Sequence, residues 1–301
     1  MKRVYIEITN ICNLSCPFCV KTNRDKKIMS INDFEKVVQK VSAEKPQIYL
    51  HILGEPLLVS NLKDYLDIIG KYGLLCNITT NGTLIDKHFD LLLDHKAVRK
   101  VSFSIHSLGD VFDNKARDYL DKILSFSKAT ISENRLIINF RMWTGGDDFL
   151  AQENMECVRY IKSAFGGEIE NSYVDGYHSI KLYNNIYIVY DKKFEWPSED
   201  SDQKSEYGKC LGLKQMLGVL VDGTVVPCCL DYNGSIGLGN LFYDSLDDIK
   251  KSSRYQSILK AFSGGKITED LCRKCSYRLR FDKRRNKNAT KEKETFRGEN
   301  R

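Results

Sequence analysis

Cys12-Asn13-Leu14-Ser15-Cys16-Pro17-Phe18-Cys19 follows a strand-like run, Val4-Tyr5-Ile6-Glu7-Ile8, near the start of this 301-residue chain. The cysteines have the spacing C-x3-C-x2-C. Three thiolates this close in sequence suit a [4Fe–4S] cluster, which four cysteines normally hold, so one iron would stay open for a small-molecule ligand. The alternatives are a zinc site or plain buried cysteines, but zinc prefers four ligands and C-x2-C pairs. The spacing therefore favours an iron–sulfur cluster.

Strand-like and helix-like segments alternate over the first two thirds of the chain. The expected strands are residues 4–8, 47–53, 74–79, 98–105 and 136–141. The expected helices are residues 30–43, 62–72, 86–95, 114–127 and 152–165. Such alternation implies a parallel sheet with right-handed crossovers. In barrels of this type the chemistry lies at the C-terminal ends of the strands, and Cys12 directly follows the first strand.

The helix expected at residues 30–43 has a clear helical period. Its apolar positions recur every three to four residues, at Ile31, Phe34, Val37, Val38 and Val41. Either Ser30 or Asn32 can cap its N-terminus.

The pattern changes after residue 165. The elements expected there are strands within 180–190 around a turn at Asn184-Asn185, a polar linker at 198–209, a hairpin of strands 216–221 and 224–227, and a helix at 245–262. The hairpin is indicated by Asp222-Gly223, a dipeptide that suits a tight turn between strands.

Composition limits the class of protein. No stretch approaches the roughly 18–20 apolar residues of a membrane span, and the N-terminus lacks the apolar core of a signal peptide. We therefore expect a cytoplasmic protein with no membrane partner. Ten cysteines in such a compartment indicate metal binding or catalysis rather than disulfides.

The cysteine trio resembles that of the radical S-adenosylmethionine (SAM) enzymes, in which SAM chelates the open iron. Phe18 fits this resemblance, because an aromatic residue commonly precedes the third cysteine in that family. The family also has a glycine- and glutamate-bearing turn that binds the amino group of SAM, and Gly54-Glu55-Pro56 matches it after the second expected strand. A carboxylate suits an ammonium. Leu53 replaces the first glycine of the usual pair, and an ordinary turn is the alternative.

The resemblance implies further SAM contacts at later strand ends. Thr80 and Asn81 would lie beside SAM, although Asn-Gly is also an ordinary turn dipeptide. Ser104 and His106 would approach the ribose of SAM. Arg141 would pair with its carboxylate, because the guanidinium fork suits carboxylates. Core, edge or surface roles are the alternatives for these three residues.

A second cysteine set lies toward the C-terminus, at Cys210, Cys228, Cys229, Cys272 and Cys275. Its order resembles the SPASM and shortened "twitch" extensions of radical SAM enzymes, which hold auxiliary [4Fe–4S] clusters. The resemblance implies that Cys210, Cys228, Cys272 and Cys275 hold one cluster, with Cys229 a doubtful neighbour. A zinc ribbon is the alternative, since C-x2-C also serves zinc.

The resemblance implies an α/β fold, a partial (β/α)6 TIM-like barrel with a small C-terminal Fe–S cluster domain. The implied domains are a core at 1–205, an auxiliary-cluster domain at 206–281 and a basic tail at 282–301. The segment from Leu279 to Arg301 contains nine Lys or Arg and four Asp or Glu, so +5 of the net charge of +6 lies there. Such a composition favours a disordered tail, and nucleic acid is not an expected partner.

The implied cofactors are SAM, its [4Fe–4S] cluster and one auxiliary [4Fe–4S] cluster. The family's reaction cleaves SAM to a 5′-deoxyadenosyl radical, which abstracts hydrogen from a substrate C–H bond. A net oxidation of a sugar or cyclitol is expected, with a peptide-modifying SPASM enzyme as the alternative. From another class, the chain could be a non-catalytic Fe–S electron carrier or a zinc-stabilised binding protein. The expected partners are a small-molecule or peptide substrate and an electron donor such as flavodoxin or ferredoxin.

Overall fold

A computed structural model describes residues 1–108, 112–144, 152–166, 170–174, 177–198, 201 and 204–281. Within these residues the strands form one sheet in the order β10-β9-β1-β2-β3-β4-β5-β8-β7-β6. The strands are β1 (Arg3–Ile6), β2 (Gln47–Tyr49), β3 (Leu75–Thr80), β4 (Val98–Ser104), β5 (Ile137–Thr144), β6 (Glu170–Val174), β7 (Tyr177–Tyr183), β8 (Ile186–Lys192), β9 (Met216–Val219) and β10 (Val225–Val226).

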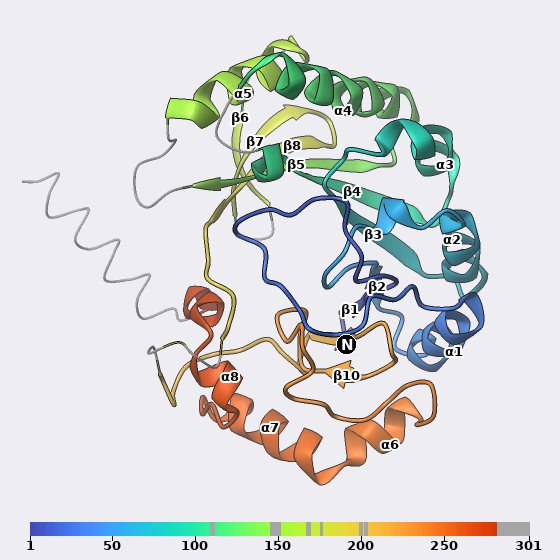
Figure 1. Cartoon of the computed structure of the whole chain (residues 1–301), viewed down its shortest axis with the longest axis vertical. Helices are drawn as coiled ribbons and strands as arrows, with labels where there is room; N and C mark the ends of the chain where they lie inside the picture. Colours follow the sequence, from blue (N-terminus) through green and yellow to red (C-terminus); the bar gives the residue numbers. More distant parts are fainter. Residues whose placement is uncertain are drawn as a thin grey trace, which may run out of the picture.

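Strands β1 to β5 run parallel to one another, and β8 runs parallel to β5 and antiparallel to β7. The helices that connect them lie outside the curved sheet (Figure 1), and are α1 (Ile31–Ser42), α2 (Leu62–Lys71), α3 (Phe89–Asp94), α4 (Asn114–Glu133) and α5 (Gln152–Ser163). This arrangement is the partial, TIM-like barrel that the sequence predicts, and it confirms the α/β class.

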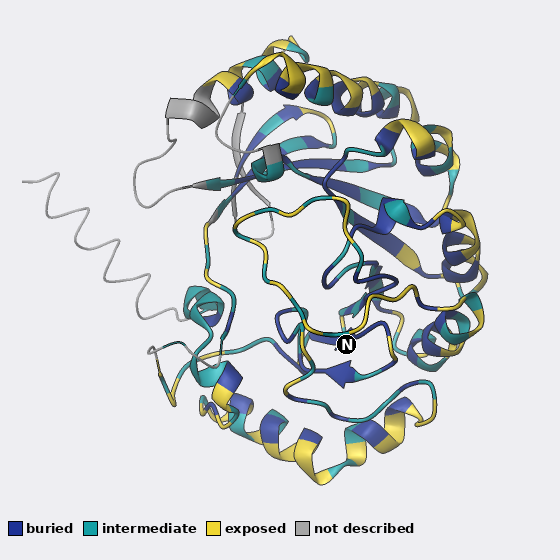
Figure 2. Ribbon diagram, viewed as in Figure 1, coloured by how far each residue is buried: buried dark blue, intermediate teal, exposed yellow. Residues whose placement is uncertain are grey.

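The local signals explain how α1 begins and which face it buries. Ser30 caps it by accepting a hydrogen bond from the backbone N–H of Asp33, so Ser30 and not Asn32 starts the helix. Its apolar positions are fully buried, at Phe34, Val37, Val38 and Val41. Figure 2 shows the same division in the other outer helices, with one face buried and the opposite face exposed.

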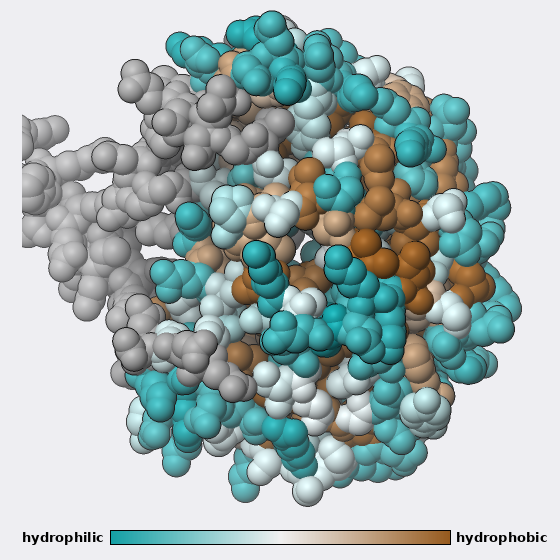
Figure 3. Space-filling model, viewed as in Figure 1, coloured by the Kyte–Doolittle hydropathy of each residue, from teal (hydrophilic) through white to brown (hydrophobic). Residues whose placement is uncertain are grey.

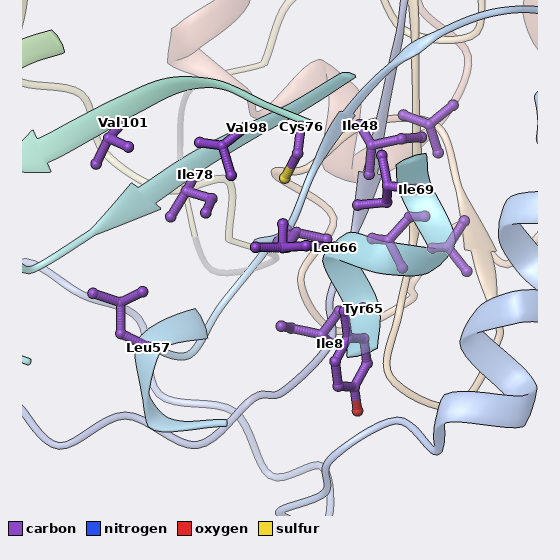
Figure 4. Packing of buried hydrophobic residues seen from close by; sticks show 14 of the residues in the cluster. Ile8, Ile48, Leu57, Tyr65, Leu66, Ile69, Cys76, Ile78, Val98 and Val101 are labelled. Carbon is purple, nitrogen blue, oxygen red and sulfur yellow. The ribbon is translucent and has the colours of Figure 1, made fainter. Parts of the chain in front are cut away.

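The hydrophobic core fills the space between the sheet and these helices. Figure 4 shows Cys76 and Ile78 of β3 packed against Leu66 and Ile69 of α2. Burial raises the pKa of Cys76 well above its ordinary value, so this thiol stays protonated. Cys76 is therefore an inert core residue.

The C-terminal part contributes to the same sheet. Strand β9 pairs in parallel with β1, and β10 returns antiparallel to β9. The predicted hairpin at Asp222-Gly223 is present, with Gly223 at a φ of +86°. Each strand is shorter than predicted, but the hairpin places the second cysteine region directly beside the first strand of the barrel.

Two helices differ from their predictions. In the helix predicted at 86–95, only Phe89–Asp94 are α-helical, after a 3-10 turn, η2 (Ile85–His88). Residues 245–262 form two helices, α6 (Leu246–Lys251) and α7 (Ser253–Ser263), separated by Ser252. The backbone of Ser252 is extended, and its hydroxyl accepts a hydrogen bond from the N–H of Tyr255. The serine thus caps a new helix and ends the old one. Two short elements follow, α8 (Asp270–Arg273) and η4 (Ser276–Phe281).

Polar residues cover the outer helices, whereas apolar residues gather nearer the middle of the face seen in Figure 3. No helix in the described part of the chain is both long and apolar enough to cross a membrane. The predicted tail at 282–301 lies outside the described residues.

Candidate functional site

The first three cysteines lie on a long loop that leaves β1 and crosses the middle of the molecule (Figure 1). Asn10 closes the base of this loop: its side chain bonds the carbonyl of Asp25 at 2.8 Å and the N–H of Lys27 at 2.8 Å. Cys12 and Cys19 are exposed, and Cys16 is half-buried. Burial raises the pKa of Cys16 and of Cys19, and the neighbouring thiols raise it further. The three thiols therefore lie near one another on this loop.

Asn81, at the end of β3, joins the cysteine loop to the turn after β2. Its side-chain Nδ2 donates to Cys12 Sγ at 3.8 Å and to Asn13 Oδ1 at 2.9 Å. Its backbone N–H donates to Glu55 Oε2 at 2.7 Å. Asn81 thus links Cys12, a predicted cluster ligand, to Glu55, the carboxylate predicted to bind the amino group of SAM.

Glu55 is held rigidly at the start of η1 (Pro56–Leu58). Its Oε1 accepts from the Thr80 hydroxyl at 2.7 Å and from the N–H of Leu57 at 3.0 Å. It is 2% exposed. Burial raises the pKa of the Glu55 carboxyl, whereas these donors oppose that rise. All the donors suit an ionised carboxylate, which accepts only.

Gly54 is required by a close approach of two backbones. Its φ is +76°, and a Cβ there would stand 2.2 Å from the carbonyl oxygen of Thr9. The N–H of Glu55 also donates to the carbonyl of Ile11 at 2.9 Å. The turn therefore packs directly against the start of the cysteine loop.

Three rings fix the other side of the cysteine loop. Phe18 meets His106 and Trp143 edge-on, with centroids 5.2 Å and 4.6 Å away. His106 stacks on Trp143 at 4.1 Å. Burial and then the Arg141 charge lower the pKa of His106 to about 3, so its ring is neutral. Ser104 lies beside Arg141 in the pairing of β4 with β5.

The second cysteine set also converges. Burial raises the pKa of Cys228, and Cys229, Cys210, Cys272 and Cys275 raise it further. Cys228 thus interacts with all four other thiols. Cys229 packs against the cluster of Ile52, Leu220 and Val226. Burial raises its pKa to about 11, and the charges of Arg141 and Arg3 oppose this rise.

Two charged side chains that support these loops were not predicted. Arg278 is 3% exposed and donates to the carbonyls of Cys272, Tyr207 and Ser205 at 3.0, 3.0 and 2.7 Å. Glu7 is fully buried after β1 and pairs with Arg24 in the cysteine loop. Glu7 could have been found from strand alternation, because it lies two residues after Tyr5 and so on the same, inward face of the chain. No local signal marks Arg278.

The donor chemistry of both sets fits iron–sulfur clusters, because soft thiolates select them. No group of three or more His, Cys, Asp or Glu side chains in the described residues is arranged to hold a metal ion. A [4Fe–4S] cluster takes each thiolate on a different iron, so its ligands stand farther apart than those of a single ion.

Two family models match the chain. The radical SAM superfamily model covers residues 6–132, and the model of an iron–sulfur cluster-binding domain, SPASM, covers residues 210–276. Together they span more than half of the chain, and each contains one of the two cysteine sets.

A curated relative is the tungsten-containing aldehyde ferredoxin oxidoreductase cofactor-modifying protein of Pyrococcus furiosus. It is 32% identical over 112 residues, which are 36% of this chain and 32% of the relative. A GTP 3',8-cyclase of Aquifex aeolicus is 27% identical over 119 residues, 36% of each chain. The match thus spans about a third of the length of these relatives.

Solved structures share the fold over nearly the whole chain. BtrN in complex with AdoMet and 2-DOIA matches with a TM-score of 0.58 at 18% identity, over 91% of this chain and 92% of BtrN. Streptococcus suis SuiB bound to its precursor peptide SuiA matches with a TM-score of 0.59 at 16% identity, over 91% of this chain and 70% of SuiB.

Proposed function

The chain belongs to the radical SAM superfamily and carries a SPASM-type iron–sulfur cluster-binding domain, and on this premise we propose that it oxidises a small polyhydroxylated substrate, a sugar or cyclitol. When bound, SAM and its [4Fe–4S] cluster supply a 5′-deoxyadenosyl radical for hydrogen abstraction. The observation that carries the proposal is the double contact of Asn81, with Cys12 Sγ on one side and the Glu55 carboxylate on the other.

We assign the residues of this site as follows. Cys12, Cys16 and Cys19 hold the first cluster. Glu55 accepts hydrogen bonds from the amino group of SAM, and Thr80 holds its carboxylate in place by donating to Oε1. Asn81 fixes the distance between cluster and amino group. The rings of Phe18 and His106 exclude water from the side of the site opposite Glu55.

Four further cysteines, Cys210, Cys228, Cys272 and Cys275, hold one auxiliary cluster in this proposal. Five cysteines in this region are enough for one cluster of four thiolates and too few for two. An oxidation of the substrate needs an acceptor for the second electron, and the auxiliary cluster is the acceptor within the chain. An external donor such as flavodoxin or ferredoxin supplies the reducing electron.

The proposed substrate class follows BtrN, whose structure contains 2-DOIA. SuiB, whose structure contains a precursor peptide, is the precedent for the competing substrate class. Peptide modification remains the competing outcome in a substrate screen.

Anaerobic purification and reconstitution test the proposal. We expect roughly eight irons per chain and release of 5′-deoxyadenosine with dithionite and SAM. Replacing Cys12, Cys16 and Cys19 with Ala should leave about four irons and abolish 5′-deoxyadenosine. Cys157→Ala, which removes a thiol in α5, is the matched control and should retain both. Zinc in place of iron, or a triple variant that keeps all its iron, would overturn the assignment.

A further inference from the structure

The inner face of the barrel has a polar lining. Side chains alternate between the two faces of a strand, and the apolar positions of β3 and β4 face the outer helices (Figure 4). The intervening positions therefore face inward. Strand pairing aligns them in rows: Tyr5 beside Tyr49, Tyr49 beside Asn77, Asn77 beside Lys100, Ser102 beside Asn139, and Ser104 beside Arg141.

Two buried polar atoms on this face lack hydrogen-bond partners among the described residues. They are Nδ1 of His51, just beyond β2, and Oδ1 of Asn139 on β5. Buried polar groups are nearly always hydrogen-bonded. Burial and then the charges of Arg141 and Lys100 lower the pKa of His51 to about 3, so its ring is neutral. A neutral polar group such as a hydroxyl would supply the missing hydrogen bond to each atom.

The inner face also carries the positive charge of Arg141. Two of the inner carboxylates are held by other arginines: Glu7 by Arg24 and Asp191 by Arg280, at 2.7 Å and 2.9 Å. No carboxylate in the described part of the chain forms an ion pair with Arg141. A half-buried guanidinium without a carboxylate suits an incoming carboxylate or phosphate, which it can bind with two parallel hydrogen bonds.

Arg141 stands apart from the proposed amino-group site of SAM. The amino and carboxylate groups of SAM share one carbon atom, so their partners must be close together. Arg141 lies on β5, where its carbonyl contacts the His106 ring at 3.3 Å. Glu55 is held by Thr80 and Asn81 at the end of β3, two strands away. This placement favours the substrate over SAM as the partner of Arg141.

We propose that the barrel interior binds an anionic, hydroxyl-bearing substrate, with Arg141 pairing its carboxylate or phosphate. Lys100, whose Nζ lies 5.8 Å from the Tyr49 ring centroid, adds a second positive charge. His51 Nδ1 and Asn139 Oδ1 bind its hydroxyl groups. This inference rests on the proposed function, because it takes the barrel interior as the substrate site.

Inorganic phosphate and succinate are the probes for the test. Each is titrated by calorimetry into the anaerobically reconstituted full chain with SAM present, for the wild type, Arg141→Gln, Arg141→Lys and Arg117→Gln. The last variant removes an exposed arginine of α4 and is the matched control. The affinity for SAM and the release of 5′-deoxyadenosine are measured on the same samples.

We expect a probe to bind the wild type in the millimolar range. Arg141→Gln should weaken it by about tenfold or more, the loss expected for a hydrogen bond between charged groups. Arg141→Lys should keep part of the affinity, and Arg117→Gln all of it. The affinity for SAM should not change. The stronger probe identifies phosphate or carboxylate as the anion.

Two results would overturn the proposal: equal probe affinity in the wild type and Arg141→Gln, or neither probe binding the wild type. A loss of SAM affinity in Arg141→Gln would instead assign this arginine to the carboxylate of SAM. Failure of the wild type to release 5′-deoxyadenosine, with Arg141-dependent phosphate binding intact, would contradict the proposed function and leave the anion site standing.

Discussion

Glu7 and Arg24 form a bidentate pair that joins β1 to the cysteine loop, with Oε1 and Oε2 of Glu7 at 2.7 Å and 2.8 Å from the guanidinium. The same two oxygens accept the N–H groups of Leu53 at 3.2 Å and Val221 at 3.0 Å. Leu53 immediately precedes Gly54, and Val221 lies between β9 and β10 in the hairpin that leads to Cys228. One buried carboxylate therefore fixes the cysteine loop, the Glu55 turn and the second cysteine region relative to one another.

Arg24→Gln should destabilise the protein strongly, because it leaves the carboxylate of Glu7 buried without a counter-charge. Breaking a buried pair in this way costs about 3–5 kcal/mol. Arg24 is 15% exposed on its side chain, so we expect the lower end of that range. The change is measured as a shift of the urea unfolding midpoint of the cluster-loaded protein under anaerobic conditions.

Lys63→Gln is the control for this prediction. Lys63 pairs with Asp67 at 2.6 Å on the surface of α2, where the side chains are 65% and 49% exposed. Such pairs contribute less than about 1 kcal/mol. Equal destabilisation by Arg24→Gln and Lys63→Gln would show that the Glu7 pair is not an organising contact.

Glu55→Gln should weaken SAM binding while both clusters remain. A hydrogen bond to a charged group contributes about 1.5–3 kcal/mol, so we expect a loss of at least about tenfold in affinity. Equilibrium dialysis with labelled SAM measures it, and iron content checks the clusters. Glu35→Gln, at an exposed pair with Lys71, is the control. Unchanged SAM affinity in a cluster-loaded Glu55→Gln protein would remove Glu55 from the SAM site.

The features predicted from sequence are those whose signal is local. The spacing of Cys12, Cys16 and Cys19, the Gly54-Glu55 turn and the helical period after Ser30 each need only a few neighbouring residues. The parallel sheet followed from the alternation of such segments. The break at Ser252 was missed because the apolar period continues across it, although a Ser-Ser pair inside a helix was a usable warning of a cap.

The missed features depend on contacts between distant residues. Glu7 and Arg24 are neighbours only because the cysteine loop folds back over β1. Arg278 bonds carbonyls of residues 205 and 207, on the other side of α6 and α7. His51 becomes informative only when its buried Nδ1 is found without a hydrogen-bond partner among the described residues. No spacing in the chain encodes such relationships.

Arg278→Gln should impair the auxiliary site and spare the first cluster. The guanidinium orders the carbonyls of Ser205, Tyr207 and Cys272 on either side of Cys210. Its loss leaves three buried carbonyls short of a donor, which we expect to lower auxiliary-cluster occupancy after reconstitution. Iron analysis and SAM cleavage measure the two clusters separately. Arg254→Gln, at a half-exposed pair with Glu269, is the control.

Full iron content in Arg278→Gln would limit the role of this arginine to stability. A fall in SAM cleavage that exceeds the fall in auxiliary iron would place its effect on the first cluster, contrary to its position in the fold. Arg278→Lys keeps the charge, but its single ammonium nitrogen cannot donate to all three carbonyls that the guanidinium reaches. This variant should therefore resemble Arg278→Gln.

Cys228 and Cys229 should differ in their effect on the auxiliary cluster, although they are adjacent. Cys210, Cys272 and Cys275 all raise the pKa of Cys228, whereas Cys229 packs against the apolar cluster of Ile52, Leu220 and Val226. Cys228→Ala and the double variant Cys272→Ala/Cys275→Ala should therefore lose about four irons and stop substrate oxidation. Cys229→Ala should keep them. All three proteins should still release 5′-deoxyadenosine with dithionite, since the proposed site for SAM lies between Cys12 and Glu55. Loss of 5′-deoxyadenosine from a variant that retains the first cluster would mean that the auxiliary cluster takes part in SAM cleavage itself. Loss of iron from Cys229→Ala alone would exchange the roles of the two cysteines.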